Sequence, residues 1–198
     1  MNLLAHAYLS FNHPEILTGN MISDYVKGKT KFDYPSGVQK GIALHRAIDE
    51  FTDAHPATKK AKEFFRPAYR LYSGAFIDVV YDHFLANDKN EFKEEAALYD
   101  FSLQVYQVLQ VYFSILPQQF QKMLPHMQQH NWLYNYRQLS GIDKSFAGLA
   151  YRAAYINESA TAFSLFTENY SALKTQYDSF FPELKNFSQQ TLSNLLHA

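Results

Sequence analysis

The segment from Phe76 to Leu85, FIDVVYDHFL, places two carboxylates in an otherwise apolar run. Asp78 and Asp82 are four residues apart, so in an α-helix they share one stripe, and His83 follows Asp82 directly. An ionised carboxylate in apolar surroundings is unfavourable by several kcal/mol unless something compensates it, and a bound cation would do so. The simpler interpretation is a surface pair that forms salt bridges, which a lone D-x-x-x-D pattern favours.

Polar pairs at the same helical spacing recur upstream of this segment, which strengthens the metal-site interpretation. They are Asn2 with His6, Asn20 with Asp24, and the series His45, Asp49 and Asp53. Carboxylates and imidazoles on four predicted helices are what a metal site inside a helical bundle requires. The last series also has a plainer interpretation, because Asp53 could cap the next segment and Asp49 could pair with Arg46 or Arg66.

The ligand types limit the chemistry of such a site. The chain has no cysteine, so a metal would be held by nitrogen and oxygen, which suits Mn²⁺, Mg²⁺, Fe or Zn²⁺. Such an ion lowers the pKa of a water molecule and neutralises a phosphoryl oxygen, while a neighbouring Asp or His accepts the proton. The pattern therefore favours phosphoester hydrolysis. The sequence has no P-loop, no dinucleotide-binding fingerprint and no G-x-S-x-G motif.

Length and composition predict one globular domain over residues 1–198. Hydrophobic residues make up 47% of the chain, and neither an internal repeat nor a low-complexity linker divides it. The first ten residues, MNLLAHAYLS, lack the basic region of an export signal, and no run approaches the roughly 18 apolar residues of a membrane span. We expect a cytoplasmic protein without membrane insertion.

The formal net charge of −1 is unevenly distributed. Up to Ser73 there are ten basic and seven acidic residues, whereas from Asp78 to Asp100 there are two basic and seven acidic ones. If several of the early aspartates turn inward, the outer face of the first part is basic and suits an acidic partner. The alternative is solvated charge without a partner. The basic residues concerned are Lys27, Lys29, Lys31, Lys59, Lys60 and Lys62.

The apolar spacing of three and four residues predicts an all-α protein without a convincing strand pair. We expect helices over residues 3–11, 15–26, 36–55, 59–66 and 67–87, with Pro67 near the start of the last, and an exposed basic loop over residues 27–37. In the second half we expect helices interrupted at Pro117, Pro125, Ser140-Gly141 and Pro182.

Five short segments, in this order and spacing, resemble the acyl carrier protein phosphodiesterase family, which is related to HD-domain phosphohydrolases. They are MNLLAHAYLS, LTGNMISDYVKG, GIALHRAIDEFTDAHP, FIDVVYDHFL and the later NWLYNYR, so the resemblance spans nearly the whole chain. It implies an all-α, HD-like helical bundle. It also implies Mn²⁺-dependent hydrolysis of the phosphodiester that joins 4′-phosphopantetheine to a serine of holo acyl carrier protein, with no nucleic acid partner.

The resemblance also assigns roles by motif. It implies that Asp24, Asp49 and Asp78 are catalytic, that His45, Asp82, His83 and Asp24 bind the metal, and that Arg46, Lys27, His6 and Asn20 bind substrate. The family's HD name refers to an adjacent His-Asp pair, whereas this chain has Asp82 before His83, which leaves the ligand assignment open.

Two other functions fit the same residues. An HD-type phosphohydrolase acting on a nucleotide or another small phosphoester needs the same metal site. A non-catalytic helical module that binds a carrier protein needs only the basic face and predicts no stoichiometric ion.

Overall fold

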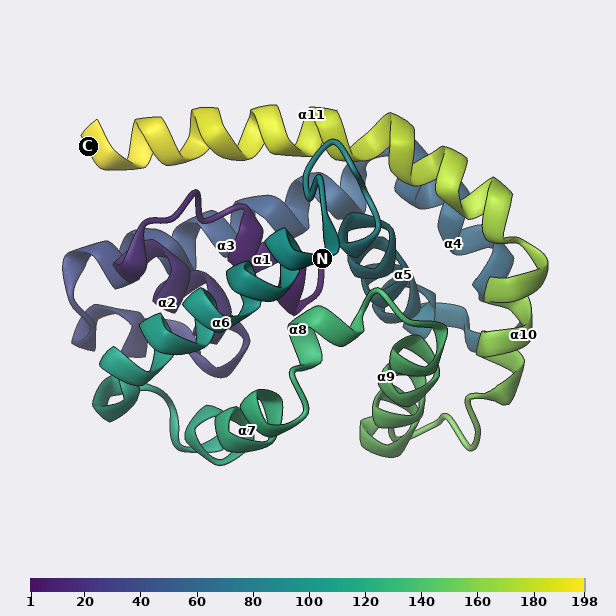
Figure 1. Cartoon of the computed structure of the whole chain (residues 1–198), viewed down its shortest axis with the longest axis horizontal. Coiled ribbons are helices and arrows are strands. Elements are labelled where there is room, and N and C mark those ends of the chain that lie inside the picture. Colours follow the sequence, from purple (N-terminus) through teal and green to yellow (C-terminus); the bar gives the residue numbers. More distant parts are fainter. Residues whose placement is uncertain (198) are drawn as a thin grey trace.

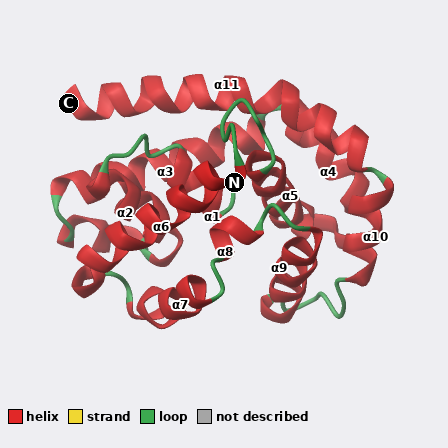
Figure 2. Ribbon diagram, viewed as in Figure 1, coloured by secondary structure: helices red, strands yellow, loops and turns green. Residues whose placement is uncertain are grey.

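The computed structural model describes residues 1–197, and within this range every regular element is helical (Figures 1 and 2). This confirms the all-α prediction. The α-helices are α1 (Leu3–Tyr8), α2 (Pro14–Ile22), α3 (Ser36–Ala54), α4 (Pro56–Tyr69), α5 (Ser73–Ala86), α6 (Glu95–Val111), α7 (Gln118–Gln129), α8 (Trp132–Asn135), α9 (Leu139–Arg152), α10 (Ala160–Glu168) and α11 (Tyr170–His197). Short 3-10 helices are η1 (Ser23–Tyr25), η2 (Gly28–Asp33), η3 (Arg70–Tyr72) and η4 (Phe113–Ile115).

The short helix α1 lies in the middle of the bundle, where it packs against α2 on one side and α5 on the other (Figure 1). Helix α3 packs along α2, and the long helix α11, drawn in yellow, runs over α3 and α4. One cluster of buried apolar side chains extends from Met1 to Leu192. No stretch of helix within the described range has the length and apolarity needed to span a bilayer.

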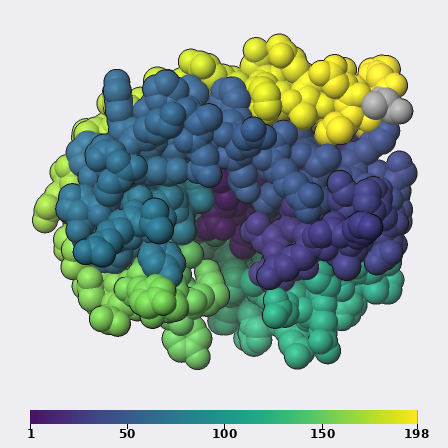
Figure 3. All heavy atoms as spheres, turned by 180° about the vertical axis from the view of Figure 1, so that it is seen from behind, coloured from purple at the N-terminus to yellow at the C-terminus, as the bar shows by residue number. Residues whose placement is uncertain are grey.

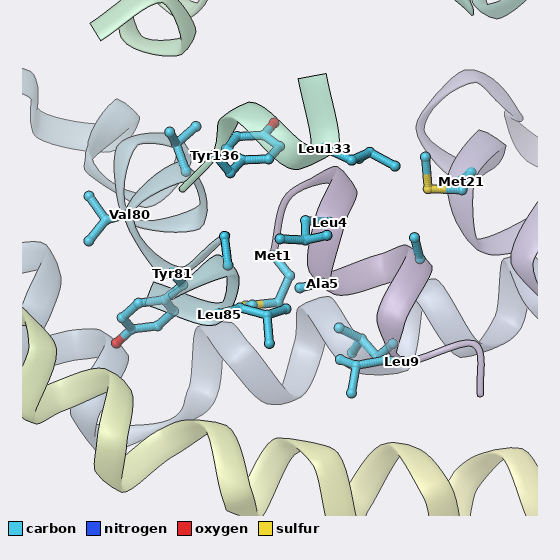
Figure 4. Close-up of a cluster of buried hydrophobic side chains, with 14 of the residues drawn as sticks. Met1, Leu4, Ala5, Leu9, Met21, Val80, Tyr81, Leu85, Leu133 and Tyr136 are labelled. Carbon is cyan, nitrogen blue, oxygen red and sulfur yellow. The ribbon is translucent and has the colours of Figure 1, made fainter. Parts of the chain in front are cut away.

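The contact between α1 and α5 is the centre of this core. Figure 4 shows Met1, Leu4 and Ala5 beside Leu85 and other side chains, most of them fully buried. An isolated helix of six residues is not stable in water, so α1 exists because these side chains pack against its neighbours. This packing brings the N-terminal segment, with His6, into the middle of the molecule.

Two glycines allow α2 and α3 to approach closely. A Cβ atom on Gly19 would lie 2.0 Å from the carbonyl oxygen of Val38, and one on Gly41 would lie 2.3 Å from the carbonyl oxygen of Ile16. Both obstacles are backbone atoms, which cannot rotate away as a flexible side chain does. The close approach matters because α2 and η1 carry Asn20 and Asp24, whereas α3 carries the residues that face them.

Replacing Gly41 with alanine should therefore lower the free energy of unfolding by about 3 kcal/mol, since the added methyl group forces the two helix backbones apart. Urea unfolding followed by circular dichroism measures the effect. Gly148→Ala in α9 is the matched control, because its Cβ would meet only the Arg152 side chain at 3.4 Å. That change should be neutral or stabilise the helix by up to about 1 kcal/mol. Equal unfolding midpoints for the two variants would contradict the packing argument.

The structure corrects several predicted boundaries. Pro67, Pro125 and Pro182 do not start or interrupt helices but lie inside α4, α7 and α11. Proline removes one amide donor and crowds the preceding turn, yet packing of the helix face can outweigh this loss. In α11 the buried side chains of Phe180, Phe181 and Leu184 surround the proline position, and the helix continues past it while changing direction (Figure 1).

Two further elements differ from the prediction, one before and one after Val26. The predicted helix over residues 15–26 is α2 followed by η1, and the predicted basic loop contains η2, in which no residue is buried.

Candidate metal and active site

The imidazoles of His6 and His45 stack face to face in the interior. Their ring centroids are 3.8 Å apart with an interplanar angle of 13°, and both residues are at least 95% buried. His6 comes from α1 and His45 from α3, helices that are far apart in the sequence. The stacked rings present the same edge in the same direction, which places their Nε2 atoms side by side.

Asn20, fully buried on α2, fixes the tautomer of both rings. Its Nδ2 donates to the carbonyl oxygen of His6 and to Ser10 Oγ, at 2.8 and 3.1 Å, which orients the amide. The amide oxygen, 2.8 Å from His6 Nδ1, therefore accepts the proton of that nitrogen. The backbone carbonyl of Asn20 accepts from His45 Nδ1 at 2.7 Å. Oxygen partners of this kind hold metal-binding imidazoles with Nε2 available.

Two carboxylates meet the Nε2 edge of the histidines. Asp49, one turn after His45 on α3, places one oxygen 3.2 Å from His6 Nε2 and the other 3.1 Å from His45 Nε2. Asp24, on η1, lies 3.2 Å from His45 Nε2 and its side chain is 78% exposed. The site thus has a buried side formed by imidazoles and an open side formed by Asp24.

Asp78 joins this group through the amino group of Met1. That nitrogen lies 3.2 Å from an Asp49 oxygen and 3.1 Å from an Asp78 oxygen, inside the protein. The two carboxylates, from α3 and α5, thus share one ammonium group. Burial raises the pKa of Asp78, and the neighbouring ammonium opposes that rise.

The two histidines have different pKa values because the carboxylates act mainly on His45. Burial lowers the pKa of His45, but hydrogen bonds to Asp24 and Asp49 outweigh it and raise that pKa to about 9. Burial and then the charge of His45 lower the pKa of His6 to about 4. Asp49 itself is buried, which raises its pKa, but its contacts with both histidines hold that pKa well below the usual range. At neutral pH the two Nε2 atoms therefore share one proton, which lies on His45 Nε2 between two carboxylates.

This arrangement fits a divalent cation. His6, His45 and Asp49 each offer one ligand atom, and the three atoms lie within 4.8 Å of one another. Each Nδ1 is occupied by an oxygen acceptor, so both Nε2 lone pairs are free to face an ion once His45 loses its proton. A set of imidazole nitrogens and carboxylate oxygens suits Mn²⁺, Fe²⁺ and Zn²⁺. Among residues 1–197 this is the one such group of three or more potential ligands.

Asp82, which the sequence analysis placed among the metal ligands, lies elsewhere. Its side chain is fully buried, and its two oxygens accept hydrogen bonds from the backbone amides of Leu4 and Ala5 at 2.7 and 3.1 Å. Those amides belong to the first turn of α1, where a carboxylate is favourable. Burial raises the pKa of Asp82 to about 7, although the two amides oppose this shift. Asp82 therefore holds the helix that carries His6.

His83 also lies outside the group. Its Nδ1 lies 2.7 Å from the carbonyl oxygen of Tyr136 and its Nε2 lies 3.0 Å from the hydroxyl of Tyr170. Both ring nitrogens thus have protein partners, and burial lowers the pKa of the ring. The contacts connect α5 to α11 and to the residue that follows α8.

The remaining predicted residues make no contact with the two imidazoles. Arg46 donates to the carbonyl oxygen of Val26 at 3.3 Å, which ties α3 to the end of η1, and Lys27 follows as an exposed residue. Asp53 does not reach the histidines, because its carboxylate is 73% exposed and pairs with Lys62 at 2.6 Å. The structure thus brings together His6, Asn20, Asp24, His45, Asp49 and Asp78 and leaves out Asp53, Asp82 and His83.

The sequence pattern gave an incomplete account of this group. It gave no signal for the Met1 amino group, because a backbone group carries no side-chain pattern. By motif it assigned His6 to substrate binding, although His6 also belongs to the polar pairs that indicated a metal site, and the structure places His6 in the candidate ligand group. The shared helical face of Asn2 and His6 indicated that His6 belongs to a polar face of its helix. It could not indicate which groups the His6 ring contacts.

Comparison with known proteins decides the family. A sequence model described as acyl carrier protein phosphodiesterase matches residues 1–184. The chain belongs to the acyl carrier protein phosphodiesterase family. Relatives named acyl carrier protein phosphodiesterase include one from Enterobacter sp. (strain 638), 30% identical over 93% of this chain and 95% of the relative. Another, from Yersinia pestis, is 30% identical over 96% of this chain and 98% of the relative.

The family resemblance inferred from the sequence motifs is thus confirmed over almost the full length. A further family member from Escherichia coli O6:H1 is 29% identical over 93% of this chain. No solved structure matches the chain, so the likeness to HD-domain proteins stays a prediction.

Proposed function

We propose that residues 1–198 form a single metal-dependent phosphodiesterase domain. Its reaction is hydrolysis of the bond between 4′-phosphopantetheine and the serine of holo acyl carrier protein, which gives apo carrier protein and 4′-phosphopantetheine. One observation carries the proposal: the Nε2 atoms of His6 and His45 converge on the carboxylate of Asp49, with both tautomers fixed from behind. The family membership supports the substrate.

His6, His45 and Asp49 would hold the cation, with Asp24 as a further ligand on the open side. We propose Mn²⁺, which accepts both imidazole and carboxylate ligands. The ion would supply Lewis-acid chemistry, namely activation of water and neutralisation of phosphoryl charge. This assignment replaces Asp82 and His83 of the sequence-based hypothesis with His6 and Asp49.

Asp78 is proposed as the proton acceptor. It is half-buried beside Asp49, and burial raises its pKa above the ordinary value of a carboxyl group, which favours a role in proton transfer at its carboxylate oxygens. Asp24 would stay ionised, because its hydrogen bond with His45 lowers its pKa. Arg46 and Lys27, next to η1, would face the anionic phosphodiester from the side of Asp24.

The test is to incubate the purified protein with holo acyl carrier protein and Mn²⁺ and to follow the carrier by mass spectrometry. We expect loss of the phosphopantetheine mass, no loss after treatment with a chelator, and recovery when Mn²⁺ is added back. A panel of nucleotides and small phosphodiesters serves as the comparison. Turnover of a nucleotide with intact holo carrier, or turnover of holo carrier that survives complete metal removal, would overturn the proposal.

A further inference from the structure

A cavity of about 600 Å³ opens beside the candidate site and has a basic wall. It lies between α4, η3 and the start of α5. Its lining includes three basic side chains, one exposed leucine and two aspartates, namely Lys62, Arg66, Arg70, Leu71, Asp53 and Asp78. The charge distribution of the sequence placed Lys62 on the basic outer face, whereas Arg66, Arg70 and Leu71 were given no role in binding.

The basic side chains come from α4 and from the residue that caps it. Lys62 and Arg66 lie one turn apart on α4, and Arg70, four residues further, is the C-cap of that helix, so the three backbone positions extend over about 12 Å. From Pro56 to Tyr72 the chain has five basic residues and one acidic residue, Glu63. The α4 side of the cavity therefore carries an excess of basic residues.

The three cations differ in their present partners. Lys62 is largely buried against Gly74 and pairs with Asp53 at 2.6 Å. Arg66 pairs with Glu63 across exposed surface, a contact of little energetic value. The side chain of Arg70 has neither a hydrogen bond nor an ion pair with any of residues 1–197 and is exposed. Arg66 and Arg70 are thus available to an external anion.

The backbone presents Arg70 and Leu71 at the rim. Arg70 has a φ of +46°, in the region that residues other than glycine seldom adopt. Such a conformation persists only where the surroundings enforce it, and it often marks a binding element. Leu71, the next residue, is 99% exposed. A fully exposed leucine beside exposed arginines resembles the apolar anchor and charged rim of a protein interface.

The cavity leads directly to the candidate active site. Asp78 lines the cavity and also shares the Met1 amino group with Asp49, one of the proposed metal ligands. Figure 3 shows the N-terminal segment, in dark purple, at the bottom of a hollow that is bordered by the blue and teal surface of α4 and α5. A partner bound along the basic wall would therefore lie next to Asp78 and the proposed metal site.

We propose that this wall, formed by Arg66, Arg70 and Leu71 with Lys62, is where an acidic helix of the carrier protein docks. The inference rests on the proposed function for the identity of the partner. A helix with carboxylates one turn apart matches cations at the same spacing, and an apolar side chain on it would contact Leu71. A single phosphate would occupy one cation, because the line extends over about 12 Å along the helix.

The experiment measures binding of apo carrier protein, which has no phosphodiester to cleave, and hydrolysis of holo carrier protein in parallel. In Arg66→Glu/Arg70→Glu the dissociation constant for apo carrier should rise at least about tenfold, and KM for holo carrier should rise similarly with kcat within about twofold. Wild-type binding should weaken with added salt. The milder Arg66→Gln/Arg70→Asn keeps the test valid if the double reversal fails to fold, because asparagine tolerates positive φ.

Two matched double reversals complete the design. Lys89→Glu/Lys93→Glu makes the same change of net charge on another exposed segment and should leave binding unchanged. Lys29→Glu/Lys31→Glu tests the other basic segment. Unchanged affinity in both cavity variants, or a loss that appears only in the Lys29 and Lys31 variant, would overturn the inference. If wild-type protein binds apo carrier through this wall but does not hydrolyse holo carrier, the proposed function fails and the docking surface stands.

Discussion

Replacing Asp49 with asparagine is expected to lower kcat/KM for holo carrier protein at least about 1000-fold, or about 4 kcal/mol in the activation free energy, while the protein stays folded. The two oxygens of Asp49 face His6 Nε2 and His45 Nε2 at 3.2 and 3.1 Å. Asparagine keeps the shape of the side chain but removes its negative charge. It also replaces one potential metal-binding oxygen with an amide nitrogen, which donates hydrogen bonds. Bound metal, measured by elemental analysis after dialysis, should fall together with the activity.

Glu50→Gln is the matched control, because Glu50 is the next residue on α3 and is exposed to solvent. It makes the same chemical change away from the site and should leave activity and metal content unchanged. Activity of Asp49→Asn within tenfold of wild type, with metal still bound, would exclude Asp49 as a ligand.

Asp82→Asn distinguishes the site proposed from the structure from the one implied by the motifs. If Asp82 acts only by holding α1, we expect a loss of about 10- to 100-fold with metal retained, as for residues that orient a ligand. If it binds the ion, metal content should fall as it does in Asp49→Asn. Both oxygens of Asp82 already accept backbone hydrogen bonds, at 2.7 and 3.1 Å, which favours the first outcome.

Helical periodicity predicted part of the geometry of the candidate site. The four-residue spacing placed His45 and Asp49 on one stripe of α3, and the two side chains do meet at 3.1 Å. The same spacing also included Asp53, which points to solvent and pairs with Lys62. Periodicity shows which residues share a face but not where along the helix the buried part of that face ends. That limit is set by the helices packed opposite.

The two aspartates of α5 show the same limitation. Asp78 and Asp82 are one turn apart on α5 and both need compensation for burial, as the sequence indicated. The groups that compensate the two charges differ, however. The Met1 ammonium group contacts Asp78, whereas two backbone amides donate to Asp82. Backbone donors and amino groups leave no trace in a side-chain pattern, so the sequence favoured a cation for both.

Metal binding should release a proton and therefore depend steeply on pH. In the metal-free protein, burial lowers the pKa of His45 but Asp24 and Asp49 outweigh it and hold that pKa at about 9, whereas burial and the His45 charge keep the pKa of His6 near 4. Between these values one proton occupies the Nε2 atom that the ion needs. The apparent affinity for Mn²⁺ should thus fall about tenfold for each unit by which the pH drops from about 9 toward 4.

Calorimetric titration with Mn²⁺ at pH 6 and pH 8 should accordingly show about a 100-fold difference in affinity. At pH 7, buffers with different ionisation enthalpies should report about one proton released per ion. His55→Ala is the control, because His55 is an imidazole outside the site that pairs with Glu183, and its loss should not change the slope. An affinity that does not change with pH would mean that the ion does not displace the His45 proton. The contact between that ring and its two carboxylates would then be a permanent ion pair, and a metal site on the stacked histidines would be excluded.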